Sequence, residues 1–270
     1  MILTEQEQAL RCQLSPAYPW KDHFCWLDQV GSTNDYLKQA AREGAPEGSV
    51  VLAEQQTNGH GRMGRTFLSP SGSGVYLSVL LRPQCKPTEL LHLTCAVGVA
   101  MCDAVENATG FRPSIKWTND LVAGKRKLGG ILTEMGFSTQ GEVSFAIAGI
   151  GINCTQEPED FPPEIRSVAT SLRMITGEEV SRERLAAAMM ESLARMSHTL
   201  LTQKSSMLAR YRKDCITLGK EISLVRGQEI RRGVALDIDE DGALIVELPD
   251  GTRQIVNSGE VSIRGMYGYV

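Results

Sequence analysis

Apolar residues recur at helical spacing in three stretches of the chain. In the first, Ser32 and Thr33 stand before a short apolar stripe that Gly44 follows, which predicts a capped helix ending at a glycine. The second stretch is Thr88–Thr109, whose expected stripe is Leu91, Cys95, Val99, Cys102 and Val105. The third is Ser181–Leu201, whose expected stripe is Leu185, Met189, Leu193 and Met196.

Strand-like runs lie between and after these helices. β-branched and alternating apolar residues predict strands over residues 49–53, 74–81, 129–135 and 143–150. From residue 219, short alternating runs broken by Gly and Asp turns predict a small all-β barrel, with runs at 222–225, 233–238, 244–248 and 253–256. We therefore expect one domain over residues 1–218 and a small β-barrel domain over residues 219–270.

Composition is that of an ordinary globular protein. The chain is 42% hydrophobic and 22% charged, and its net charge of −4 gives no general attraction to nucleic acid. No apolar run reaches the roughly 18–20 residues that span a bilayer, and no secretory signal opens the sequence. The seven cysteines form no C-x-x-C pair, which is typical of free thiols in a reducing compartment. We expect a cytoplasmic protein that binds neither nucleic acid nor a membrane.

A loop rich in glycine and arginine spans residues 59–65. Its letters match the G-x-G-x-x-G fingerprint of dinucleotide-binding folds, but the segment 66–74 cannot open the helix that this fingerprint requires. Its glycines would let backbone N–H groups approach a ligand closely, and Arg62 and Arg65 suit phosphate oxygens. Taken alone, the loop is equally compatible with a bare surface hairpin carrying two solvated arginines.

Two further clusters combine polar groups with glycines. Lys116–Asp120 and Lys127–Leu132 flank a short basic turn, which is the layout of a hairpin that holds an amide, a carboxylate and a lysine near one cleft. A solvated turn with surface lysines is the alternative. Residues 149–153 end an apolar strand with two glycines and an amide, where a ligand could lie against the backbone.

Other catalytic and metal motifs fail on their spacing. Asp237, Asp239 and Asp241 resemble the start of a calcium loop, but Leu248 stands where a glutamate is required, so a hairpin turn is the better interpretation. The four histidines share no motif with a serine or cysteine nucleophile, and no G-x-S-x-G elbow exists. Neither a calcium site nor a triad hydrolase is expected.

As a set, the motifs resemble those of the biotin–protein ligase family. The matching pieces occur in the family's order: Gly31–Asn34, Gln55–Thr57 with the loop 59–65, Lys116–Asp120, Lys127–Ile131 and Gly149–Asn153. The resemblance implies an α+β fold, with a mixed sheet and helices as in class II aminoacyl-tRNA synthetases and lipoate ligases. A small C-terminal β-barrel follows it.

The resemblance also implies an ATP-dependent ligase. In the family, the biotin carboxylate attacks the α-phosphate of MgATP to give biotinyl-5′-AMP, and a lysine of a carrier protein then attacks this mixed anhydride. The implied ligands are biotin as substrate, ATP and Mg²⁺. The implied partner is the biotin carboxyl carrier protein of acetyl-CoA carboxylase or of a related biotin-dependent carboxylase. We expect a monomer or a homodimer.

Residue roles follow from the matching positions. The biotin side would use hydroxyl, amide and backbone groups of Ser32, Thr33, Asn34, Gln56, Gly59, Gly130, Gly149 and Gly151. Phosphates would be held by Arg62 and Arg65, and adenine by Phe67, Asn119 and Asn153. Lys127 would bridge the biotin carboxyl and the α-phosphate. Lys127, Arg62 and Asp120 form the expected catalytic set, with Asp120 positioning Mg²⁺ or the incoming lysine.

Some positions depart from the family pattern. His60 stands where arginine is normal, Thr118 where proline is common, and Phe67 where tryptophan is frequent. We assign no phosphate to His60, because histidine is only weakly charged near neutral pH. No basic helix precedes the first motif, so a DNA-binding repressor role is not expected.

Two alternatives remain open from the sequence. One is a lipoate–protein ligase-like transferase of the same superfamily. The other is a non-catalytic module that binds biotin or a nucleotide. The presence of both Lys127 and Asp120 argues against a loss of catalytic activity.

Overall fold

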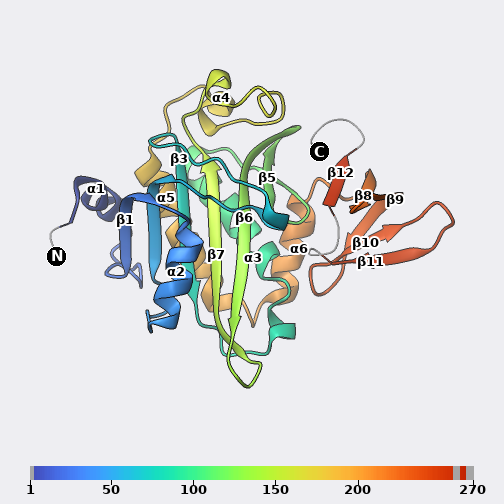
Figure 1. The fold of residues 1–270 in the computed structure, drawn as a ribbon, viewed down its shortest axis with the longest axis horizontal. Coiled ribbons are helices and arrows are strands. Elements are labelled where there is room, and N and C mark those ends of the chain that lie inside the picture. Colours follow the sequence, from blue (N-terminus) through green and yellow to red (C-terminus); the bar gives the residue numbers. More distant parts are fainter. Residues whose placement is uncertain (1–2, 258–261, 266–270) are drawn as a thin grey trace.

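A mixed seven-stranded sheet forms the centre of the larger part of the protein (Figure 1). The computed structural model describes residues 3–257 and 262–265. The sheet has the order β1-β2-β3-β7-β6-β5-β4. Its strands are β1 (Phe24–Val30), β2 (Val50–Gln56), β3 (Gly74–Leu81), β4 (Ser114–Lys116), β5 (Asp120–Ala123), β6 (Arg126–Phe137) and β7 (Val143–Asn153). Only the β1–β2 pair is parallel, so the predicted mixed sheet of an α+β fold is confirmed.

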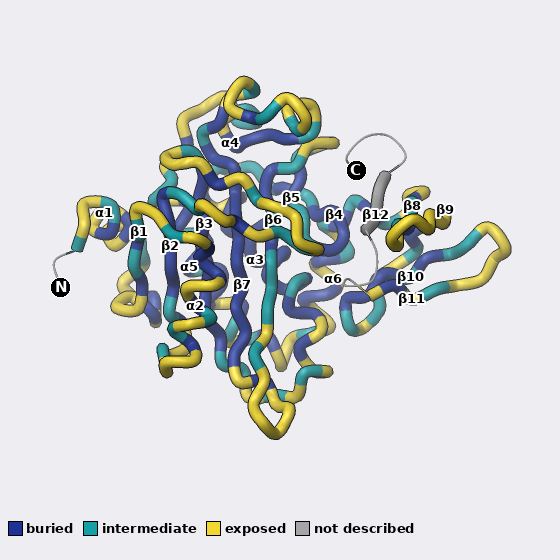
Figure 2. Tube along the Cα trace, in the orientation of Figure 1, coloured by how far each residue is buried: buried dark blue, intermediate teal, exposed yellow. Residues whose placement is uncertain are grey.

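Helices cover both faces of this sheet. On one face lies α2 (Thr33–Arg42), whose Leu37 and Ala41 pack on Leu80 and Ile147. On the other lie α3 (Leu93–Thr109), α5 (Arg182–Thr199) and α6 (Lys204–Asp214). The remaining helices are α1 (Glu5–Gln13), α4 (Leu172–Thr176) and the 3-10 turns η1 (Arg62–Gly64), η2 (Pro87–Leu90) and η3 (Pro158–Asp160). The central strands are therefore covered on both faces, and Figure 2 shows β7 buried along almost its whole length.

Most of the predicted elements form. The helix expected after Ser32 is α2, with the Ser32 side chain accepting from the backbone N–H of Asp35, and the third predicted helix is α5, whose whole predicted stripe is buried. The predicted strand at 74–81 is β3, whose eight residues are all buried. The strand expected over 143–150 continues to Asn153, so residues 149–153 form the end of β7, as the glycine-containing motif there indicated.

The second predicted helix differs in detail. It is divided into the turn η2 and helix α3, and Leu91 lies between them with its side chain 53% exposed, so its place on the buried stripe was wrong. α3 is buried on nearly all sides because it lies between the sheet and helices α5 and α6. By length and composition alone, Pro87–Thr109 could cross a membrane; its burial is that of a core helix.

The C-terminal part is a five-stranded antiparallel sheet with the order β11-β10-β9-β8-β12. Its strands are β8 (Glu221–Arg226), β9 (Glu229–Ile238), β10 (Leu244–Glu247), β11 (Arg253–Val256) and β12 (Ser262–Gly265). Three of the four predicted runs lie within β8, β9 and β11, and the fourth, 244–248, extends one residue past the end of β10, so the small all-β unit is confirmed. The boundary at residue 218 stays a prediction.

The turn between β9 and β10 contacts the larger part of the protein. Asp239 Oδ1 accepts from the backbone N–H groups of Asp241 and Ala243 in the turn between these two antiparallel strands, so the predicted hairpin turn forms. The carbonyl of Gly242 accepts a hydrogen bond of 3.0 Å from Trp117 Nε1. The small sheet is thereby fixed against the predicted motif at 116–120.

Candidate active site

A cavity of about 760 Å³ lies over the sheet, beside the N-terminus of α2. Strand alternation explains its position. Phe145 and Ile147 point towards α2, and the next two residues on that face of β7 are Gly149 and Gly151, which leave space where side chains would otherwise stand. The predicted residues that line the cavity are Ser32, Thr33, Asn34, Gln56, Arg62, Arg65, Phe67, Asn119, Asp120, Lys127, Gly130, Gly149 and Gly151.

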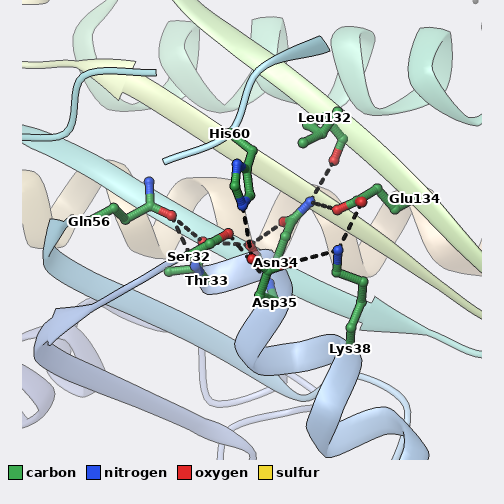
Figure 3. Close-up of polar contacts among 10 residues, drawn as sticks. Ser32, Thr33, Asn34, Asp35, Lys38, Gln56, His60, Leu132 and Glu134 are labelled. Atoms are coloured by element: carbon green, nitrogen blue, oxygen red, sulfur yellow. Dashed lines mark hydrogen bonds and ion pairs between the residues drawn. The ribbon is translucent and has the colours of Figure 1, made fainter. Parts of the chain in front are cut away.

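One end of the cavity carries neutral hydrogen-bonding groups. The backbone N–H and the hydroxyl of Thr33 donate to Gln56 Oε1 at 2.9 and 3.1 Å (Figure 3). Gln56 Nε2 in turn donates to Ser69 Oγ at 2.9 Å. Ser32 and Thr33 are both buried. Buried polar groups without formal charge suit a neutral polar ligand, because no charged group has to be removed from water when the ligand binds.

Asn34 has a different place from the one its motif suggested. Its Nδ2 donates to the carbonyl of Leu132 at 3.2 Å and to Glu134 Oε2 at 2.8 Å. A Cβ on Gly149 would lie 2.0 Å from Asn34 Oδ1, so the amide occupies the space that this glycine leaves. Asn34 Oδ1 accepts from Ser78 Oγ on β3 at 2.6 Å, so the Asn34 amide ties the start of α2 to β6 and β3 at the edge of the cavity.

The opposite end is charged. Lys127 Nζ lies 2.7 Å from Asp120 Oδ1, in side chains that are 29% and 16% exposed. Asp120 pairs with Gly130 across β5 and β6, and a Cβ there would lie 3.4 Å from Lys127 Nζ, so the glycine leaves room for the pair. Lys116 also lines this end and is buried. The predicted hairpin thus brings the lysine and the carboxylate into one cleft, and the solvated-turn alternative was wrong.

Arg62 reaches the same charged end from the loop 59–65. Its Nη1 donates to Asn119 Oδ1 at 2.9 Å, and Asn119 Nδ2 donates to the carbonyl of Ile131 at 2.9 Å. Burial lowers the pKa of Arg62, and neighbouring Arg65 acts in the same direction while Asp120 opposes it. A guanidinium remains protonated in proteins, so Arg62 is a partly desolvated cation. A bound anion would stabilise such a cation.

The loop 59–65 forms a hairpin, with a bridge between His60 and Thr66. Phe67 N–H donates to the carbonyl of Gly59 at 2.9 Å, and Gly61 N–H donates to that of Arg65 at 2.6 Å. A Cβ on Gly59 would lie 2.4 Å from the Phe67 carbonyl oxygen. Gly59 is absent from the residues that line the cavity. Among the described residues, it therefore serves the close approach of the two hairpin strands and not the wall of the cavity.

The Phe67 ring lies on β7. A Cβ on Gly151 would be 2.3 Å from Phe67 Cε1, and the ring meets Tyr76 edge-on with centroids 6.4 Å apart. The aromatic ring thus covers the bare backbone of Gly151 and forms a wall of the cavity. Tyr76 in turn donates to the carbonyl of Pro70 at 3.0 Å, which fixes the end of the loop.

Asn153 lies outside the cavity, contrary to the sequence-based expectation that it contacts a ligand. Its Nδ2 donates to the carbonyl of Thr170 at 2.9 Å. Thr170 N–H donates to the carbonyl of Lys127 at 2.9 Å, and Lys127 N–H donates to that of Val168 at 2.7 Å. Asn153 therefore anchors the segment 154–171 against β6 and helps to fix the backbone of Lys127.

Several cavity residues were not predicted. They are His60, Gly61, Met63, Thr66, Lys116, Trp117, Ile131, Leu132, Ile150, Glu164 and Val168. Lys116 and Trp117 belong to a motif that the sequence did single out, so that motif could have found them. Glu164 and Val168 come from the segment 154–171, which carries no recognisable pattern and reaches the cavity only through its pairing with β6.

The comparisons with known proteins agree with this architecture. Residues 26–153 match the model of the Biotin/lipoate A/B protein ligase family, and residues 217–264 match that of the Biotin protein ligase C terminal domain. These two matches, one on the part of the chain that forms most of the mixed sheet and one on the small β-unit, define the class as a protein ligase. The second match distinguishes the biotin branch of the class.

Individual relatives give the same answer. The chain is 34% identical to the bifunctional ligase/repressor BirA of Bacillus subtilis over 252 residues, which cover 87% of this chain and 73% of the relative. It is 32% identical to the biotin–[acetyl-CoA-carboxylase] ligase of Mycobacterium tuberculosis over 262 residues, 94% of each chain. A solved structure of the biotin protein ligase from Aquifex aeolicus, in complex with biotin and ATP, is 30% identical with a TM-score of 0.76 over 90% of this chain and 99% of that one. The chain belongs to the biotin protein ligase family, and the enzyme class predicted from the sequence is confirmed.

Proposed function

We propose that this ligase joins biotin to ATP as biotinyl-5′-AMP and then transfers the biotin to one lysine of a biotin carboxyl carrier protein. The observation that carries the proposal is the division of a single cavity into a neutral hydrogen-bonding end and a cationic end. Biotin has a neutral ureido ring at one end and a carboxylate at the other. Residues of β6 and β7 line the cavity between its two ends.

Biotin binding uses the neutral end. The ureido ring both donates and accepts hydrogen bonds, and Ser32, Thr33 and Gln56 offer hydroxyl, N–H and amide groups for both purposes. Gly130 and Gly149 are among the residues that line the cavity, and the ligand's apolar chain would lie along the strands that carry them. The named relative with bound biotin and ATP has the same fold, which supports this placement.

The first reaction brings two anions together. A carboxylate oxygen of biotin attacks the α-phosphorus of ATP, the bond from that phosphorus to the β-phosphate oxygen breaks, and pyrophosphate leaves. Arg62, Arg65 and Lys127 surround the cationic end, so their charges would offset the repulsion between the reactants and the negative charge that builds in the transition state. Lys127 is the proposed bridge between the biotin carboxylate and the α-phosphate.

Asn119 and Phe67 complete the nucleotide side of the proposal. Asn119 holds the Arg62 guanidinium, so we assign it the role of positioning that cation for the phosphates. Phe67 would stack on adenine, since its ring lines the cavity at the point where it packs over Gly151. Asn153 would act one step further away, by anchoring the segment that holds Lys127.

Magnesium would accompany the nucleotide. Within residues 3–257 and 262–265, no group of three or more His, Cys, Asp and Glu side chains is arranged to hold a metal ion. Mg²⁺ commonly binds through one or two carboxylates together with substrate phosphates, and Asp120 is a carboxylate at the phosphate end of the cavity. Asp120 would therefore be its ligand, and the ion would neutralise phosphate charge.

The second reaction forms the amide bond. The amine nitrogen of the carrier lysine attacks the acyl carbon of the mixed anhydride, the carbon–oxygen bond to AMP breaks, and the amine loses a proton. Asp120 would orient this lysine once the first reaction is complete. The carrier of acetyl-CoA carboxylase is the proposed partner because a relative covering 94% of the chain is named for that protein. All seven cysteines are free, which supports a reducing cytoplasm as the location.

Exchange of labelled pyrophosphate into ATP tests the proposal. The protein should catalyse this exchange when biotin is present, because adenylate formation is reversible while the carrier is absent. Lipoate should not replace biotin. Exchange that depends on lipoate would assign the protein to the other branch of the superfamily, and tight biotin binding without any exchange would make it a non-catalytic module.

A further inference from the structure

A chain of polar contacts joins the loop 59–65 to helix α2. His60 Nε2 lies 2.9 Å from Asp35 Oδ2, and Lys38 Nζ lies 2.7 Å from the other oxygen of the same carboxylate (Figure 3). Lys38 Nζ also lies 2.9 Å from Glu134 Oε1 on β6. The second oxygen of Glu134 accepts from Asn34 at 2.8 Å. The loop is thus tied to α2, and α2 to the sheet, through one continuous set of side chains.

The His60–Asp35 contact lies on the hairpin that carries Arg62 and Phe67 into the cavity. His60 and Thr66 form a bridge across the hairpin, and Arg62 and Phe67 enter the cavity from this same hairpin. On the other partner, Asp35 lies in the first turn of α2, directly after Thr33 and Asn34. One helical turn therefore contacts both the neutral end of the cavity and the loop that closes the charged end.

The electrostatics favour this contact. Burial raises the pKa of Asp35, but hydrogen bonds from Lys38 and His60 outweigh it, so the carboxyl pKa is lowered below its usual value. Asp35 is consequently an anion over the working pH range. The imidazole Nε2–H can donate to that anion whether the ring is neutral or protonated.

We propose that His60 and Asp35 form a positioning pair that keeps the loop 59–65 closed over the adenylate while biotin occupies the site beside Thr33. The pair rests on the proposed function, because it acts on the adenylate that the first reaction makes. It acts through Arg62 and Phe67, which the loop carries, and not by contact with the reacting atoms. The adenylate is prone to hydrolysis, so the time for which the loop stays closed sets the fraction of adenylate that is lost.

The size of the effect follows from exposure. The two side chains are 38% and 48% exposed, so water competes with the contact and the pair is weak. Partly exposed pairs of this kind change an equilibrium by roughly two- to fivefold. The release of adenylate should rise by that factor when either partner is removed.

The test follows AMP release without the carrier, at saturating biotin and ATP, in which each AMP reports one lost adenylate. His60→Asn and Asp35→Asn should each raise this release roughly two- to fivefold. AMP release by the double variant should be no faster than by either single variant, because both substitutions remove the same contact. His60→Arg should return release to the wild-type rate, since its guanidinium can pair with Asp35. The KM for biotin should be unchanged throughout.

Controls separate the pair from general damage. Asp22→Asn removes a comparable exposed ion pair, with Arg11, far from the loop, and should leave release unchanged. Melting temperatures of all variants should match, so that a change in release cannot come from unfolding. A wild-type release rate in Asp35→Asn, or additive effects in the double variant, would overturn the pair alone. A wild type that forms no biotin-dependent AMP would overturn the proposed function and the pair with it.

Discussion

Replacing Lys127 by alanine tests the charged end of the cavity most sharply. The change removes the cation proposed to bridge the two reactants, and it also takes away the partner that lies 2.7 Å from Asp120. Loss of one group that stabilises transition-state charge typically costs about 10²–10³ in rate, or about 2.7–4 kcal/mol. Lys127→Ala should therefore lower the rate of adenylate formation by at least that factor.

The ion pair adds a second, separable effect. In Lys127→Ala the Asp120 carboxylate, which is 16% exposed, would face the incoming anions without its lysine partner. At separations of about 6–8 Å and an effective dielectric constant of about 20, two unit charges repel by about 2–3 kcal/mol. Solvent in the cavity reduces this repulsion. We expect the effect of Asp120→Asn to differ by about tenfold between the wild-type and Lys127→Ala backgrounds, and to be less harmful in the latter.

The assay is single-turnover formation of pyrophosphate from biotin and MgATP. Lys125→Ala is the matched control, because Lys125 is exposed in the turn of the same hairpin and should retain the wild-type rate. A rate near that of wild type for Lys127→Ala would refute the central role of this lysine. Equal effects of Asp120→Asn in both backgrounds would show that the ion pair has no part in the reaction.

Two further predictions concern packing and pH. In Gly151→Ala the new methyl group would displace the Phe67 ring, since a Cβ there lies 2.3 Å from it; the KM for ATP should rise about tenfold while biotin affinity changes little, as titration calorimetry would show, and an unchanged KM would contradict adenine stacking. Burial lowers the pKa of His92, so protonation opposes folding: stability is complete above the ordinary histidine pKa and falls as the pH drops towards the lowered folded value. Between about pH 7.5 and pH 5.5 the Tm of the wild type should fall more than that of His92→Leu, whereas the exposed His198→Gln should keep the wild-type dependence; equal slopes for all three would refute this assignment.

The sequence predicted the helices and strands in which apolar residues recur with a clear helical or strand periodicity. α2, α5 and β3 have clear apolar patterns and capping or glycine signals, and they form where expected. α6 was missed because only three of its eleven residues are buried, so its apolar signal is weak. β1 was missed because its polar residues break the alternation, although it pairs with β2 in the sheet.

The sequence predicted which motifs form the candidate site, but it did not predict the hydrogen bonds between residues of different motifs. The motifs lie on separate strands and one loop that the sheet brings together, so the lining of the cavity follows closely from them. Asn34 and Asn119 line the cavity as expected and Asn153 does not, and the amides of all three bond the protein's own backbone and side chains. Such use of an amide depends on which distant carbonyl lies nearby, and no local pattern encodes it. The contact of His60 with Asp35 has the same origin.

Transfer of biotin to a carrier tests the central claim most directly. The isolated biotin carrier domain of an acetyl-CoA carboxylase would be incubated with the protein, biotin and MgATP, and then measured by intact-mass and peptide mass spectrometry. The proposed function predicts a mass increase of one biotinyl group on a single carrier lysine, dependent on ATP and greatly slowed by Lys127→Ala. A carrier whose mass stays unchanged while the protein binds biotin and ATP would contradict it.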